Sequence, residues 1–107
     1  MKVYYLNGVQ EILRGVDGEP MGSVEAPFIV GALMAGALFQ LPANWDEAAA
    51  VHSLARRLFD CKDKVLKMDA SEKRLLEKAL KQLAQSTSGG VLAQLKQIYD
   101  KIEEKEE

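Results

Sequence analysis

The chain has 107 residues, of which 48% are hydrophobic and 28% are charged, and its formal net charge is −2. This is the composition of one ordinary globular domain, so it excludes a disordered acidic protein, a collagen-like chain and a disulfide-knit miniprotein. Because 14 basic residues are balanced by 16 acidic ones, no overall positive field attracts nucleic acid. We therefore expect a single domain over residues 1–107.

Cysteine content and hydropathy bear on the compartment. The only cysteine is Cys61, so no intrachain disulfide can form, and the reducing cytoplasm is the expected location. The sequence reaches Asn7-Gly8 too early for the apolar stretch of a signal peptide. The most apolar segment, 26–41, is shorter than the about 20 residues that cross a bilayer. We interpret it as a buried helix and expect no membrane association.

Residues 1–25 predict β structure. Residues 3–6 favour a strand, and Asn7-Gly8 is a strong hairpin signal because both residue types tolerate positive φ. The chain would then return antiparallel over residues 9–14, and Asp17-Gly18 indicates a second turn. We expect a β-hairpin, with a three-stranded meander as the alternative. It must pack on helices, because an isolated hairpin is only marginally stable in water.

Residues 26–102 predict a helical region. The segment 27–40 is apolar on all sides, so we place it as the central helix. An amphipathic helix is expected from the N-cap Asn44 to about Asp60, and residues 65–68 predict an extended piece alongside the hairpin.

Two closing helices complete the helical region. The first is expected from the capping pair Asp69 and Glu72 to about Gln85, and the second from about Val91 to Ile102. The charged residues 103–107 are expected to fray into solvent. The predicted fold class is α+β and mostly helical, with an N-terminal β-hairpin packed on about four helices.

Few residues could carry chemistry. In one continuous helix, His52 and Cys61 would lie on opposite sides and roughly 13 Å apart along the axis. We interpret Cys61 as a small core residue and His52 as a boundary residue. One histidine and one cysteine do not make a zinc site, and Gly89-Gly90 lacks the lysine of a phosphate-binding loop. We expect no catalytic residues, no cofactor and no metal, and hence no enzyme.

The charge distribution along the chain raises a nucleic-acid hypothesis. From Arg56 to Lys81 there are nine basic and five acidic residues, a local excess of four positive charges. No aromatic platform interleaves with them, and the last helix ends in acidic residues. We keep a nucleic-acid-binding regulator that uses the basic 56–81 face as the alternative. The main interpretation is a solvated face or a docking face for an acidic protein.

Two features point to a protein partner. Trp45, His52, Arg56 and Arg57 bring aromatic and guanidinium groups near one helical face, and these types are enriched at interfaces. The alternative for Trp45 is a staple that fixes the start of the helix onto the core. The last helix carries an apolar stripe that should pack on the preceding helix. The stripe is wider than one helix covers, so formation of a homo-oligomer through it is kept as an alternative.

Three stretches support a family resemblance: Asp17-Gly18-Glu19-Pro20, the apolar run 28–34, and residues 64–69 followed by Glu72. Together they resemble a set of small proteins of tailed bacteriophages and prophages, generally of unassigned function. The chain departs from them by a longer link between Pro20 and the first helix. The resemblance implies a phage accessory protein in the cytoplasm of a bacterial host, acting in assembly or on a host process. The resemblance implies no catalytic residues in this chain.

Overall fold

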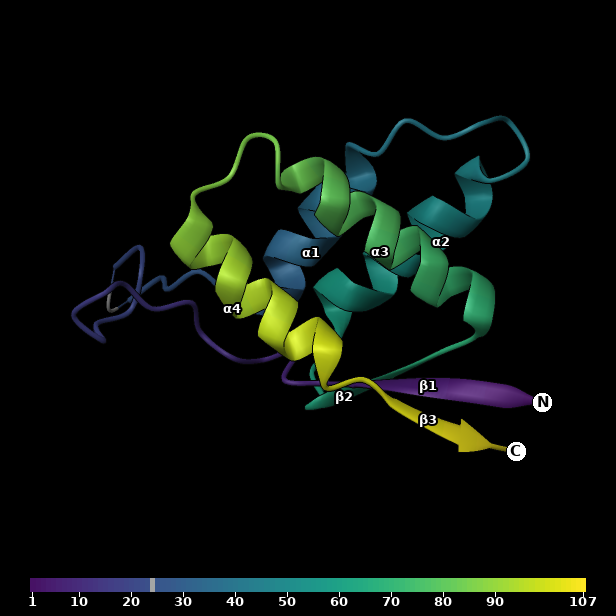
Figure 1. The fold of residues 1–107 in the computed structure, drawn as a ribbon, viewed down its shortest axis with the longest axis horizontal. Coiled ribbons are helices and arrows are strands. Elements are labelled where there is room, and N and C mark those ends of the chain that lie inside the picture. The colour runs from purple at the N-terminus through teal and green to yellow at the C-terminus, as the bar shows by residue number, and fades with distance from the viewer. Residues whose placement is uncertain (24) are drawn as a thin grey trace.

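The computed structural model describes residues 1–23 and 25–107. Its elements follow the order β1 (Lys2–Asn7), α1 (Val30–Phe39), α2 (Ala48–Asp60), β2 (Val65–Met68), α3 (Ala70–Leu83), α4 (Gly89–Asp100) and β3 (Glu103–Glu106). In this described part, the helices form a layer on one side of a small antiparallel sheet (Figure 1). The predicted class, α+β and mostly helical, is confirmed.

The sheet joins segments that are far apart in the sequence. Its central strand is β1, with β2 on one side and β3 on the other, and both pairings are antiparallel. Tyr4 is opposite Met68 of β2 and Glu104 of β3. The extended piece predicted at 65–68 is therefore confirmed as a strand.

The predicted hairpin across Asn7-Gly8 is wrong. Gly8 does take a positive φ of 87°, and its carbonyl accepts a hydrogen bond from the Glu11 N–H, so a turn is present. This turn leads the chain away from the sheet and into the helical layer, where Val9 and Leu13 are buried. Burying these two side chains is more favourable than pairing residues 9–14 with β1. The two edges of β1 pair with β2 and β3 instead.

The second predicted turn, at Asp17-Gly18, is present. Gly18 has a φ of 81°, and its N–H donates to the Gly15 carbonyl. Isolated bridges pair Ile12 with Ile29, Arg14 with Pro20 and Gly22 with Pro27. They fold the described residues of this segment into an irregular meander that projects from the body of the molecule (Figure 1).

The predicted fraying of residues 103–107 is also wrong. Glu103–Glu106 forms β3, and the side chains of β1 hold it in place. The Tyr4 hydroxyl donates to Glu104 Oε1 at 3.0 Å and the Tyr5 hydroxyl to Glu107 Oε1 at 2.8 Å. The charged composition of residues 103–107 predicted a solvated C-terminal end. Instead, the open edge of β1 and the hydroxyl groups of Tyr4 and Tyr5 bind this acidic segment as a strand.

The helices begin and end close to their predicted limits. The capping box of α3 is confirmed: Asp69 Oδ1 accepts the Glu72 N–H at 2.8 Å, and Glu72 Oε1 accepts the Asp69 N–H at 3.1 Å. Asn44 caps a turn rather than α2 itself, since its Oδ1 accepts the Glu47 N–H at 2.8 Å and the helix starts only at Ala48.

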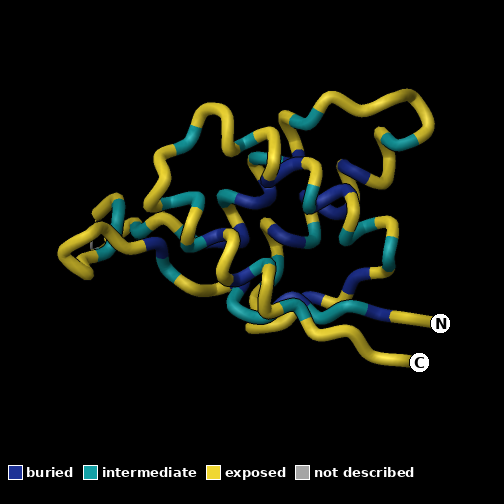
Figure 2. Tube along the Cα trace, in the orientation of Figure 1, coloured by how far each residue is buried: buried dark blue, intermediate teal, exposed yellow. Residues whose placement is uncertain are grey.

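The core lies between the sheet and the helices, and between α1 and its neighbours (Figure 2). As predicted for a central helix, α1 packs on both α2 and α3. Its close contact with α2 needs Gly31, because a Cβ there would lie 2.6 Å from Val9 Cγ1 and 3.1 Å from the Leu58 carbonyl oxygen. The burial of α1 is nevertheless one-sided, since Ala32, Gly36 and Phe39 are exposed.

The last helix packs inward as expected. Leu95 and Ile98 of α4 are buried, and α4 contacts α3 and β1. Within the described residues, no helix combines the length and the apolar character needed to cross a bilayer.

Candidate functional site

A groove lies between α1 and α2 and opens to solvent. Small residues of both helices line it, together with Phe39 of α1 and Phe59 of α2. Its cavity volume is about 370 Å³. We call the following set the α1–α2 face: Ala32, Gly36, Phe39, His52, Arg56 and Phe59.

The aromatic side chains of the α1–α2 face are largely uncovered. Phe39 is 73% exposed and Phe59 is 69% exposed, although both are strongly apolar. A single exposed apolar residue is common on protein surfaces, but neighbouring ones around a groove with a polar rim are typical of interaction sites. The α1–α2 face therefore has the character of a docking surface.

Two of the polar side chains that line this groove, His52 and Arg56, come from α2, and Gln40 at the end of α1 is a third. Arg56 Nε lies 3.5 Å from Asp60 Oδ2, one helical turn further along, and both side chains are mostly exposed. His52, one turn before Arg56, lines the same groove. Two of the four residues predicted to bind a partner, His52 and Arg56, are thus brought together.

Arg57 lies elsewhere. Its guanidinium donates to the Glu72 carboxylate and to the Lys67 carbonyl, and so joins α2 to the start of α3 and to β2. Glu72 is only 17% exposed at its side chain. Arg57 is therefore placed to stabilise the fold, apart from the groove.

Trp45 precedes α2 in a turn and is 94% exposed. The alternative that it staples the start of the helix onto the core is therefore wrong. It does not line the groove, so it provides a separate exposed aromatic side chain near the start of α2.

Neither phenylalanine of the face was predicted as a site residue: Phe39 falls in the segment 27–40, expected as a buried central helix, and Phe59 falls in the amphipathic helix expected to end at about Asp60. For Phe39, the signal that could have found it was the apolar character of 27–40 on every side. α1 packs mainly on α2 and α3, and this packing leaves Ala32, Gly36 and Phe39 on its uncovered side.

The basic 56–81 face is largely neutralised by neighbouring acids. Five of its nine basic side chains form ion pairs, namely Arg56, Arg57, Lys67, Lys78 and Lys81. The Lys73 ammonium lies over the rings of Tyr4 and Tyr99, 5.0 and 5.5 Å from their centroids. These contacts reduce the positive field that a nucleic acid would meet.

The groups with shifted pKa values lie outside the groove. Burial, and then the hydrogen bond to Glu77, raise the pKa of Tyr99 to about 12, and this contact ties α4 to α3. Cys61 is half-buried and packs against the core. Over residues 1–23 and 25–107, His, Cys, Asp and Glu side chains do not gather in a group of three or more that could hold a metal ion.

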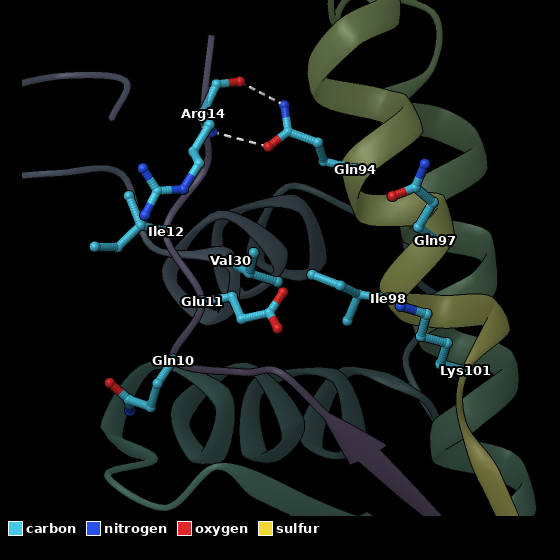
Figure 3. A pocket seen from close by; sticks show the side chains of 9 residues that line it. All are labelled: Gln10, Glu11, Ile12, Arg14, Val30, Gln94, Gln97, Ile98 and Lys101. Atoms are coloured by element: carbon cyan, nitrogen blue, oxygen red, sulfur yellow. Dashed lines mark hydrogen bonds between the residues drawn. The ribbon is translucent and has the colours of Figure 1, made fainter. Parts of the chain in front are cut away.

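A larger hollow, about 540 Å³, lies between residues 10–14 and α4 (Figure 3). Its main polar contact belongs to the fold: Gln94 Oε1 accepts the Arg14 N–H at 2.8 Å, and Gln94 Nε2 donates to the Arg14 carbonyl at 2.7 Å. The amide thus pairs with the backbone as a neighbouring strand would. These two hydrogen bonds hold α4 against the N-terminal segment beside the hollow.

Comparisons with protein-family models, with curated protein sequences and with solved structures gave no match to this chain. Its function is therefore inferred from its own residues.

Proposed function

We propose that this protein is not an enzyme and acts by binding another protein through the α1–α2 face. The observation that carries this proposal is the exposure of Phe39 of α1 and Phe59 of α2, which line one groove. Exposed apolar surface of this kind, with polar groups at its edge, is where protein partners bind.

The energetics favour a protein segment as the occupant. Removing one phenylalanine side chain from water contributes about 1.5–3 kcal/mol. A partner that covers both phenylalanines and the small residues of the groove gains most of this contribution at each of them, because both side chains are largely exposed in the single chain. An amphipathic helix laid between two helices is a common way to achieve it. His52 and Arg56 at the rim would then orient the partner.

We further propose that the protein is an accessory factor of bacteriophage type in the cytoplasm of a bacterial host. This part is supported by the resemblance carried by Asp17-Gly18-Glu19-Pro20, residues 28–34 and residues 64–69. Particle assembly and modulation of a host process both fit a small binding protein. A nucleic-acid-binding regulator is less favoured, since five of the nine basic residues in 56–81 are already paired.

The test is affinity capture from the cells that make the protein, with identification of the captured protein and titration of the purified pair. Phe39→Ser combined with Phe59→Ser should remove the partner and raise its dissociation constant at least tenfold. Val16→Ser is the matched control, because Val16 is fully exposed and lies outside the face. If a folded double variant binds the same partner as tightly as the wild type, the proposal is wrong.

A further inference from the structure

The Asn7-Gly8 dipeptide, which does not form a hairpin, lies where β1 meets both of its neighbours. Asn7 is the last residue of β1, and its partner in β2 is Val65. The Gly8 N–H donates to the carbonyl oxygen of Lys64, the residue before β2, at 3.0 Å. Toward β3, Asn7 Nδ2 donates to Glu103 Oε1 at 3.4 Å. The dipeptide therefore joins the end of β1 to both neighbouring strands.

An asparagine followed by a glycine is chemically labile. The glycine nitrogen attacks the side-chain carbonyl carbon of the asparagine and closes a five-membered imide, and the side-chain nitrogen leaves as ammonia with the proton of the glycine amide. Water then opens the imide at one of its two carbonyls, which gives aspartate or isoaspartate. Glycine favours the attack because it has no Cβ to hinder it, and Gly8 takes a φ of 87°, which itself favours glycine.

The native sheet opposes this reaction at Asn7. The Gly8 nitrogen must lose its proton and turn toward the Asn7 side chain, but its N–H is bound to the Lys64 carbonyl. The Asn7 amide must also leave its contact with Glu103. We propose that Asn7 is a site of spontaneous modification, which the closed sheet protects and which converts to aspartate or isoaspartate when the end of β1 opens. Opening of an element's end costs less than unfolding of the whole chain.

Conversion to aspartate works against closure of the sheet. An oxygen then takes the place of Asn7 Nδ2, so the donor to Glu103 is lost and two carboxylates face each other where the donor and acceptor lay 3.4 Å apart. Like charges at this distance repel. Lys105 Nζ, 3.8 Å from Glu103 Oε2, offsets part of the repulsion. The converted end of β1 is therefore open more often than the original one.

Conversion to isoaspartate changes the backbone itself. The main chain then runs through the former side chain and is one carbon longer between residues 7 and 8. Gly8 cannot stay opposite Lys64 while Val9 keeps its place, and Val9 is buried with its carbonyl accepting the Gly31 N–H at 2.9 Å. The extra carbon thus disturbs either the β1–β2 ladder or the contact with the start of α1.

Mass spectrometry of the tryptic peptide 3–14 measures the conversion of Asn7 during incubation of the full chain in mildly alkaline buffer. The native chain should convert at least about tenfold more slowly than the same chain in guanidinium chloride, since an opening free energy of about 1.4 kcal/mol already gives a factor of ten. Asn44, the other asparagine, precedes the bulky Trp45 and should stay largely unconverted in both states. It is the internal control.

A variant of β2 tests whether opening of this end limits the reaction. Val65→Gly removes the β-branched strand partner of Asn7 and should speed up the native conversion about fivefold while circular dichroism stays unchanged. Val16→Gly is the matched control, because Val16 is fully exposed and lies outside the sheet, and it should convert as the wild type does.

The product is tested with Asn7→Asp, which should unfold at a lower urea concentration than the wild type at neutral pH. The difference should shrink when both chains also carry Glu103→Gln, because the opposed carboxylate is then gone. Three outcomes overturn the inference: equal conversion rates in the native and denatured chains, no conversion in the denatured chain, or an unchanged rate in Val65→Gly. An Asn7→Asp chain as stable as the wild type would show that conversion to aspartate leaves the sheet closed.

Discussion

Lys67 Nζ lies 2.6 Å from Glu107 Oε2, so an ion pair links β2 to the residue that follows β3, across the central strand. The Tyr5 hydroxyl of β1 donates to the other oxygen of the same carboxylate. One carboxylate therefore connects all three strands on the exposed side of the sheet. Chain segments separated by about a hundred residues of sequence meet at this point.

Stability should depend on pH through Glu107. The hydrogen bond from Lys67, and then that from Tyr5, lower the pKa of Glu107. A carboxyl with a lowered pKa adds stability above its usual pKa, and this contribution is lost as the pH falls through the lowered value. Glu107→Gln should therefore melt below the wild type at neutral pH, and the difference should shrink as the pH falls below the usual range of a glutamate carboxyl. A pH-independent difference in thermal melts, or an equal effect of Glu25→Gln, would contradict this.

Removal of residues 103–107 should destabilise the protein. The truncation deletes the β1–β3 ladder and leaves the phenols of Tyr4 and Tyr5 without their carboxylate partners. We expect a loss of about 1 kcal/mol or more, which corresponds to roughly 4–8 °C in the melting temperature. The bared edge of β1 should also promote association, visible by light scattering. If the truncated chain had the same melting temperature as the full chain, this segment would be a solvated tail after all.

Arg57 and Arg56 are adjacent in sequence but should differ in their effect on stability. Arg57→Ala removes contacts to the Glu72 carboxylate and the Lys67 carbonyl and should cost about 1 kcal/mol, a value reduced for its partial exposure. Arg56→Ala removes one exposed pair within α2 and should cost no more than about 0.5 kcal/mol. Urea denaturation of both variants measures the difference. Equal losses, or the reverse order, would show that Arg57 does not join α2 to β2 and α3 as described.

Leu95 should behave as a core residue and not as an interface residue. Its side chain is fully buried within the single chain. Leu95→Ala should cost about 2–5 kcal/mol, and Leu95→Asp should prevent folding as judged by circular dichroism. Gln97→Ala, an exposed position of the same helix, should change stability by less than about 0.5 kcal/mol. A well-folded Leu95→Asp chain of wild-type stability would rule out the core role.

Features that depend on near neighbours in sequence could be predicted. The capping box of Asp69 and Glu72 forms because its four groups lie within one helical turn. The amphipathic α2 and the strand at Val65–Met68 follow from patterns within a dozen residues. The turn at Asp17-Gly18 likewise follows from the conformational freedom of Gly18, which takes a positive φ. In each of these cases the stabilising contacts, or the conformational freedom, are local.

The tertiary structure alone decided which strands pair and which apolar side chains stay outside. No local pattern marks Glu103–Glu106 as a strand, since all four side chains are charged and exposed. The strand forms because β1, about a hundred residues earlier, offers an open edge and the donors Tyr4 and Tyr5. In the same way, the apolar pattern of α1 cannot tell which side faces the core. Packing against α2 and α3 decides that, because these helices cover one side of α1 and leave Phe39 at the surface, in the groove that the exposed Phe59 of α2 also lines.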